Sequence, residues 1–178
     1  MKEERLPLKG MVYASMFGAM TAVGALVSIP LQPVPIVLTN LFLNIAAVLL
    51  GPALAALSQI IYILLGVIGL PVFSGGKAGF GVLLGPTGGY LVGFVLGAFV
   101  IGWIVRQKKE PTVAWLVFSM TIGLAVIYAC GVLQLALVAK LSLTKALAVG
   151  VLPFLIGDAL KIAVATAISL RLKGKIHL

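Results

Sequence analysis

Charged residues, histidine and cysteine are all scarce in this sequence. Asp, Glu, Lys and Arg together make up 10% of its 178 residues, and there is one cysteine and one histidine. A soluble domain usually carries about 25% charged residues, so the composition excludes an ordinary water-soluble globule and a disordered chain. Cys130 alone cannot form an intramolecular disulfide, and with His177 as the single histidine we expect no metal site and no Cys-His or Ser-His catalytic centre. We therefore expect neither an enzyme nor a bound cofactor.

Apolar residues are abundant instead. They make up 62% of the chain and give it a mean hydropathy of +1.24, values typical of an integral membrane protein. The length accommodates several spanning helices of about 20 residues each and leaves no room for a soluble domain. We therefore predict an all-α integral membrane bundle in which residues 1–178 form a single transmembrane domain.

Gly-Pro turns and charge clusters separate the apolar runs and predict six transmembrane helices. Their expected ranges are 8–29, 35–50, 53–70, 86–106, 112–138 and 146–171. Proline fits the first turn of a helix, so Gly51-Pro52 predicts a tight turn that starts the third helix. The fifth helix is long for a span, so we expect it to tilt or to contain a break.

The net charge of +9 comes from thirteen basic and four acidic residues. Because the basic residues follow the ends of the apolar runs, we expect them to orient the chain and to contact anionic membrane lipid, and we expect no nucleic-acid partner. With six spans, three basic residues fall on one side of the membrane: Lys77, Lys140 and Lys145. Nine fall on the side that holds both termini: Lys2, Arg5, Lys9, Arg106, Lys108, Lys109, Arg171, Lys173 and Lys175. This asymmetry predicts cytoplasmic N and C termini in a multi-pass protein of the cytoplasmic membrane.

Asp158 and Lys161 lie within an otherwise apolar helix. A charge at the centre of a span costs roughly 2.5–3.5 kcal/mol on insertion scales, so it normally faces a cavity or a partner. The spacing of three residues puts both side chains on one face of the helix. They form either an ion pair that locks the bundle or a polar ligand site near the middle of the membrane. Pro153 and Gly157 loosen the helix here, which suits a cavity wall.

The segment 69–90 is rich in glycine and yet apolar. Such a backbone lies at membrane depth only where protein buries it or where it lines a cavity, so we predict a compact, re-entrant segment on the outer side. Lys77 within it either positions the segment at the interface or anchors an anionic group.

The connection between the first two helices, with Pro30, Pro33 and Pro35, is expected to be stiff and extended.

A few neutral polar residues interrupt the second and third helices: Thr39, Asn40, Asn44, Gln59 and Tyr62. Asn40 and Asn44 are four residues apart and share a face. Each of these side chains either forms hydrogen bonds between helices or lines a polar pocket.

Small residues form two stripes. Ala14, Gly18 and Ala22 lie at intervals of four in the first helix, with Ser15 and Ala19 beside them. Such a stripe allows another helix to approach closely, either within this chain or in another membrane subunit. The second stripe, Gly89, Gly93 and Gly97, is expected to be an internal contact.

Three groups of residues carry a resemblance to a known family. The first is Pro33-Val34-Pro35-Ile36, and the second is the segment 66–94, with Gly-Leu-Pro-Val-Phe, Gly-Gly-x-x-Gly and Leu-Gly-Pro-Thr-Gly-Gly-Tyr. The third is Pro153-Phe154-x-x-Gly157-Asp158-x-x-Lys161. Together they resemble the BioY family, the biotin-specific substrate-binding (S) components of energy-coupling factor (ECF) transporters.

The resemblance implies a six-helix S-component fold that binds biotin near the outer side of the membrane, capped by the connection between the first two helices. It also implies a transmembrane coupling subunit and two cytosolic ATPases as partners. It points to Asp158, Lys161 and Lys77 as ligand-binding residues, and Tyr90 joins them as a candidate. The Ala14-Gly18-Ala22 stripe is similar to the A-x-x-x-A docking motif of S components.

One position departs from the family pattern. Some relatives have a basic residue directly after Gly-Gly-Tyr, where this chain has Leu91. Lys77 then becomes a candidate for binding the ligand carboxylate. Two other functions remain open at this point: an S component for another vitamin, and a self-sufficient channel or proton-coupled carrier in which Asp158 titrates.

Overall fold

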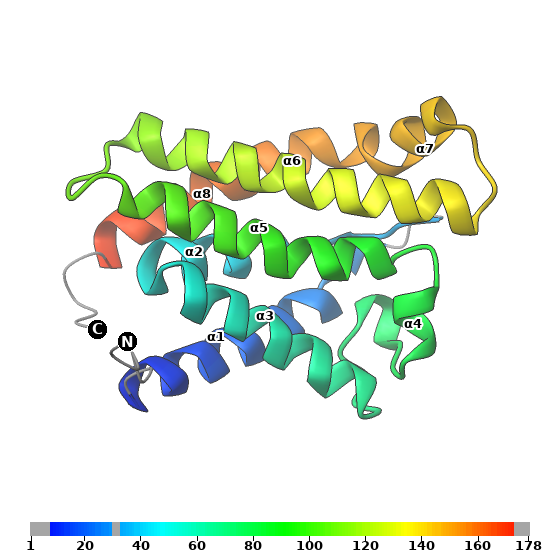
Figure 1. Cartoon of the computed structure of the whole chain (residues 1–178), viewed down its shortest axis with the longest axis horizontal. Helices are drawn as coiled ribbons and strands as arrows, with labels where there is room; N and C mark the ends of the chain where they lie inside the picture. The colour runs from blue at the N-terminus through cyan, green and yellow to red at the C-terminus, as the bar shows by residue number, and fades with distance from the viewer. Residues whose placement is uncertain (1–7, 30–32, 173–178) are drawn as a thin grey trace, which may run out of the picture.

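The computed structural model describes residues 8–29 and 33–172, and these are mostly helical (Figure 1). A two-stranded antiparallel hairpin, β1 (Ser28–Ile29) and β2 (Ile36–Val37), pairs Ser28 with Val37 and Ile29 with Ile36. The α-helices are α1 (Leu8–Leu26), α2 (Thr39–Leu50), α3 (Pro52–Val67), α4 (Gly81–Leu84), α5 (Gly88–Arg106), α6 (Val113–Val138), α7 (Leu143–Gly150) and α8 (Leu155–Leu172). Two short 3₁₀ helices are η1 (Ser74–Gly76) and η2 (Leu152–Phe154).

The six helical stretches predicted from the sequence are present, with shifted ends and one break. The first helix ends at Leu26 instead of residue 29, because Ser28–Ile29 form strand β1, and the third ends at Val67 instead of residue 70. The second helix begins at Thr39, because the residues before it form strand β2 of the hairpin. The last predicted helix is broken into α7 and α8 by the short helix η2, and Pro153 lies in the first turn of η2. The long fifth helix of the prediction, α6, is continuous over its 26 residues.

The helices pack side by side in a bundle. The α6 helix and the α7–α8 stretch run along one side, α1 and α3 run along the other, and α2 and α5 lie between them (Figure 1). A glycine seam joins α5 to α6: a Cβ on Gly93 would lie 2.9 Å from Ile127 Cα, and one on Gly97 would lie 3.0 Å from the Gly123 carbonyl oxygen. The second small-residue stripe is therefore an internal contact, as predicted.

The turn between α2 and α3 is tight, as the sequence predicts. Gly51 has a φ of 80°, a left-handed conformation that favours glycine, and Pro52 starts α3. Arg106, the last residue of α5, donates a hydrogen bond to the Leu50 carbonyl oxygen at 3.0 Å. This bond places a cation at the C-terminal end of α2, where the helix dipole favours it.

Three stretches of the described chain are long and apolar enough to cross a membrane: Gly88–Arg106, Val113–Val138 and Leu143–Leu172. The α2 and α3 helices are apolar but shorter, with 12 and 16 residues.

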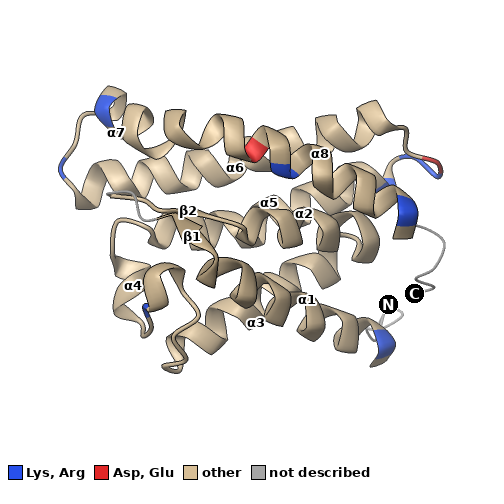
Figure 2. Ribbon diagram, turned by 180° about the vertical axis from the view of Figure 1, so that it is seen from behind, with Lys and Arg blue, Asp and Glu red and all other residues tan. Residues whose placement is uncertain are grey.

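The start of α1 and the ends of α5 and α8 lie at one end of the bundle (Figure 2). Basic residues stand at all three: Lys9, Arg106 and Arg171. Four residues of the predicted basic asymmetry lie outside the described residues: Lys2, Arg5, Lys173 and Lys175.

Candidate functional site

A cavity opens between the hairpin, the segment that joins α3 to α5, and helices α2, α3, α5, α6 and α8. The proline-rich connection contributes Val34, Pro35 and Val37 to its lining. We call two groups of its polar residues the inner end and the outer end; Thr39, Tyr62 and Tyr90 also line the cavity. The inner end consists of Asn40, Tyr128, Asp158 and Lys161, and the outer end consists of Ser74, Lys77 and Thr87.

The Asp158 carboxylate is the centre of the inner end. Its Oδ1 atom accepts hydrogen bonds from Lys161 Nζ at 2.8 Å and from Asn40 Nδ2 at 3.3 Å. Its Oδ2 atom accepts a hydrogen bond from the Tyr128 hydroxyl. Three helices, α2, α6 and α8, therefore hold one carboxylate, which is 3% exposed.

Lys161 completes the inner end. Its side chain is 7% exposed, and its ammonium forms an ion pair with Asp158. An ammonium has three N–H donors, and a carboxylate can accept about four hydrogen bonds. The pair can therefore offer both a donor and an acceptor to a ligand, in surroundings of low polarity that strengthen such bonds. Figure 2 shows the acidic and basic residues next to one another within the length of α8.

The outer end is held differently. Lys77 is exposed and follows Gly75 and Gly76, which have φ values of 73° and 71°. The loop closes on itself through hydrogen bonds from Phe73 N to the Lys77 carbonyl and from Gly76 N to the Phe73 carbonyl, both at 3.0 Å. The Phe73 ring anchors the loop, because it packs on Gly66 and meets Tyr62 edge to face, with 5.7 Å between ring centroids.

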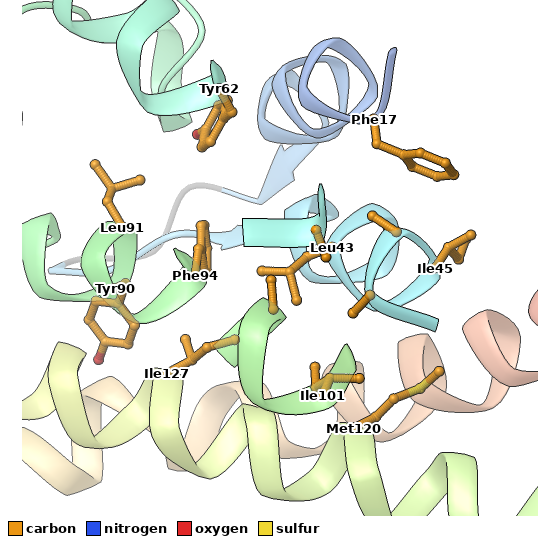
Figure 3. Close-up of a cluster of buried hydrophobic side chains, with 14 of the residues drawn as sticks. Phe17, Leu43, Ile45, Tyr62, Tyr90, Leu91, Phe94, Ile101, Met120 and Ile127 are labelled. Atoms are coloured by element: carbon orange, nitrogen blue, oxygen red, sulfur yellow. The ribbon is translucent and has the colours of Figure 1, made fainter. Parts of the chain in front are cut away.

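The residues between the two ends are apolar. The α5 helix contributes Leu91 and Phe94, α6 contributes Ile127, and η2 contributes Phe154. In Figure 3, Leu91, Phe94 and Ile127 belong to a cluster that continues along the bundle to Ile101 and Met120. Leu91 therefore presents an aliphatic side chain to the cavity at the position where some relatives are expected to carry a cation.

Gln134 of α6 fastens the segment that includes α4. Its Nε2 atom donates to the carbonyl oxygens of Leu83 at 2.6 Å and Gly85 at 2.8 Å. On the other side of this segment, Gly79 N donates to the Gly66 carbonyl at 2.7 Å. The segment 69–87 is thus compact and tied to both α3 and α6, which agrees with the compact segment predicted from its glycines.

The cavity brings together six of the eight residues predicted to bind a ligand: Thr39, Asn40, Lys77, Tyr90, Asp158 and Lys161. The Thr39 hydroxyl is buried without a partner in the described chain. The Tyr90 hydroxyl donates to the Gly150 carbonyl at 2.8 Å, so it also ties α5 to the end of α7.

The other two predicted residues lie away from the cavity. Asn44 is 5% exposed and is absent from the lining. Gln59 is fully buried between α3 and α1, and its Nε2 atom donates to Ser58 Oγ at 3.0 Å and to Thr21 Oγ1 at 3.4 Å. Of the two roles predicted for Gln59, the structure therefore supports the hydrogen bond between helices and not the lining of a pocket.

The first small-residue stripe faces the interior. Ala14, Gly18 and Ala22 are all buried, and a Cβ on Gly18 would lie 2.8 Å from the Ser58 carbonyl oxygen of α3. Ser15 and Ala19 lie on the exposed face of α1. The stripe therefore serves close packing of α1 on α3 in this structure.

Sequence reasoning missed Tyr128 and Ser74. Tyrosine in membrane proteins gathers at the membrane–water interface, so a tyrosine in the middle of the 112–138 run was a signal that could have identified Tyr128. Ser74 carried no such signal, because serine is common in loops.

Known proteins resemble this chain over most of its length. The sequence model of the BioY family matches residues 1–177. A biotin transporter BioY from Thermotoga maritima is 46% identical over 166 residues, which cover 93% of this chain and 96% of that protein. A probable biotin transporter BioY from Pyrococcus horikoshii is 41% identical, with 90% and 93% covered.

A solved structure shares the fold as well. It is a crystal structure of the S-component for biotin from an ECF-type ABC transporter, with a TM-score of 0.86 and 29% identity, covering 93% of this chain and 91% of that one. The family match spans nearly the whole chain, and the fold and the sequence relatives agree with it. This chain belongs to the BioY family.

Proposed function

We propose that this chain captures biotin and mediates its uptake as the substrate-binding component of an ECF-type transporter. The observation that carries the proposal is the buried Asp158–Lys161 pair at the inner end of a largely apolar cavity, in a chain whose relatives are biotin transporters. Apolar cavities with a few placed polar groups are typical of small-molecule sites. The role is transport rather than catalysis, and no cofactor is needed to bind the ligand.

The chemistry of biotin matches the two ends of the cavity. Its ureido group presents two N–H donors and one carbonyl oxygen. A carboxylate accepts N–H bonds and an ammonium donates to a carbonyl, so Asp158 and Lys161 bind the ureido group at the inner end. The ring and the valeryl chain contact Leu91, Phe94 and Ile127, and the ligand carboxylate points toward Lys77.

We assign the membrane arrangement from the apolar runs and the basic residues of the sequence. The chain forms one transmembrane domain with six spans in the cytoplasmic membrane, and lipid contacts its exposed apolar side chains. The basic residues at the start of α1 and at the ends of α5 and α8 support an orientation with that end of the bundle in the cytoplasm. The cavity then faces outward, where biotin is captured.

Uptake requires energy from partner subunits. We assign these as a transmembrane coupling subunit and two cytosolic ATPases, because the structural relative is the S-component of an ECF-type ABC transporter. The α1 helix is the candidate docking element. Because Gly18 packs on Ser58, a leucine there is expected to disrupt the fold and with it biotin binding. A leucine at exposed Ala19 is expected to impair complex formation and uptake while leaving binding unchanged.

These two α1 variants are compared by biotin binding, co-purification with the ECF subunits, and uptake by cells. Complex formation that survives Ala19→Leu would count against docking through this face. Biotin binding by a well-folded Gly18→Leu protein would count against the inward packing of the stripe.

The binding function itself is tested by calorimetry on the detergent-solubilised protein, with riboflavin and thiamine as control ligands. We expect selective binding of one biotin per chain. A folded, ligand-free sample that gives no heat with biotin would contradict the proposal. Binding of a control vitamin instead would identify an S component for that vitamin, and biotin flux in vesicles that contain this chain alone would identify a self-sufficient carrier.

A further inference from the structure

The outer end of the cavity has too little buried charge to require an ionised carboxylate on the ligand. Two cations line the cavity in the described chain, Lys161 and Lys77. Lys161 is buried and already paired with Asp158. Lys77 is exposed, on a loop whose glycines Gly75, Gly76 and Gly79 have open space around them.

An exposed cation contributes little to the affinity for an anion. Water screens the pair, and holding a long lysine side chain in one geometry costs entropy, so such a pair changes an equilibrium by about fivefold or less. The wall beside this end adds no charge, because Leu91 and Phe94 are apolar. Removing the negative charge from the ligand is therefore expected to lower its affinity only slightly.

The neutral hydroxyl groups at the outer end can bind either an acid or an amide. The Ser74 Oγ atom is buried and has no hydrogen-bond partner in the described chain, and Ser74 and Thr87 both line the cavity. A hydroxyl can donate to a carboxylate oxygen or to an amide carbonyl oxygen, and the bond to the charged oxygen is the stronger of the two. A buried hydroxyl without a partner is costly, so a ligand oxygen that reaches it is stabilised.

We propose that this site also binds neutral carboxamides of biotin, with the terminal carbonyl oxygen held by the Ser74 hydroxyl rather than by a charge. This inference rests on the proposed function, because it assumes that the ureido group occupies the inner end. It extends the ligands from biotin to a class that shares the ureido ring and differs at the carboxyl end.

The test measures the affinities of the full-length solubilised protein for biotin and for biotinamide by competition. We expect biotinamide to bind within about fivefold of biotin. Ser74→Ala is expected to weaken the binding of both ligands, whereas Lys77→Gln is expected to weaken that of biotin alone, by about fivefold or less. Lys145→Gln is the matched control, since Lys145 is an exposed lysine of α7 that does not line the cavity.

The outcomes separate this inference from the function on which it rests. If the wild-type chain binds biotin but loses more than about fivefold for biotinamide, the inference is overturned and the function stands. The Lys77→Gln variant then identifies the group that binds the carboxylate. If biotin and biotinamide bind this variant equally well, Lys77 binds the carboxylate strongly; if biotin still binds much more tightly, another group binds it. A wild-type chain that binds neither ligand overturns both.

Discussion

The inner and outer ends of the cavity hold their polar groups in opposite ways. At the inner end, donors from three helices converge on the buried Asp158 carboxylate. At the outer end, Lys77 is exposed on a glycine-rich loop, and the Ser74 hydroxyl has no partner in the described chain. The inner side chains hold one another through hydrogen bonds, whereas the outer side chains are positioned by the backbone of their loop.

This difference indicates where affinity and specificity arise. Preorganised donors and acceptors in a buried site lose little entropy on binding and are not screened by water. Exposed groups on a loop contribute less per contact. Changes at the inner end are therefore expected to have large effects on binding, and changes at the outer end small ones.

The largest effect is expected from Asp158→Asn. The substitution removes the negative charge and replaces one of the two acceptor oxygens by an NH2 donor, so we expect biotin to bind at least tenfold more weakly in calorimetry. It also leaves Lys161 buried without its ion-pair partner, which typically destabilises a protein by about 3–5 kcal/mol. Thermal unfolding of the same sample measures that loss.

A double variant separates ligand binding from stability. Asp158→Asn with Lys161→Met removes the whole ion pair, and replacing a buried pair by apolar groups is often neutral for stability. We expect the double variant to unfold at a higher temperature than the single variant and still to bind biotin poorly. Normal affinity in a folded Asp158→Asn protein would show that the pair is a structural lock and not a ligand site.

Tyr128→Phe is expected to have a smaller effect at the same end. The variant keeps the ring and removes the hydroxyl that donates to Asp158 Oδ2. The carboxylate stays paired with Lys161 but can turn, so we expect biotin affinity to fall by about three- to tenfold, as for the loss of one hydrogen bond. Tyr13→Phe in α1 is the control, because Tyr13 does not line the cavity. Equal affinities in the two variants would mean that Tyr128 does not position the carboxylate.

Local spacing made part of this site predictable from the sequence. Asp158 and Lys161 are three residues apart on one helix, so helix geometry alone brings them together. Tyr128 and Asn40 are 30 and 118 positions away from Asp158, and their contacts depend on how α6 and α2 are rotated against α8. A single sequence does not specify that rotation, and Tyr128 was therefore missed.

The same limit explains Asn44, Gln59 and the α1 stripe. Polarity in an apolar helix predicts that Asn44 and Gln59 avoid lipid, but a bundle interior and a cavity wall satisfy this equally well. Likewise, small residues predict a close neighbour for α1 without identifying it, and that neighbour is α3. The helical stretches were predictable because apolar runs and Gly-Pro turns are local signals.

The smallest effect is expected from Gln134→Leu at the outer end. Gln134 binds the carbonyl oxygens of Leu83 and Gly85 and so fastens the segment that contributes Val82 and Thr87 to the cavity. Without these bonds the segment opens more often. We expect biotin to dissociate only about two- to threefold faster in a competition chase, because Gly79 still ties the segment to α3 and the inner end still binds the ureido group. Gln107→Leu is the matched control, since its amide bonds the Trp103 carbonyl of its own helix away from the cavity. If Gln134→Leu left the dissociation rate of biotin unchanged, the contact of Gln134 with the segment 69–87 would not control ligand release.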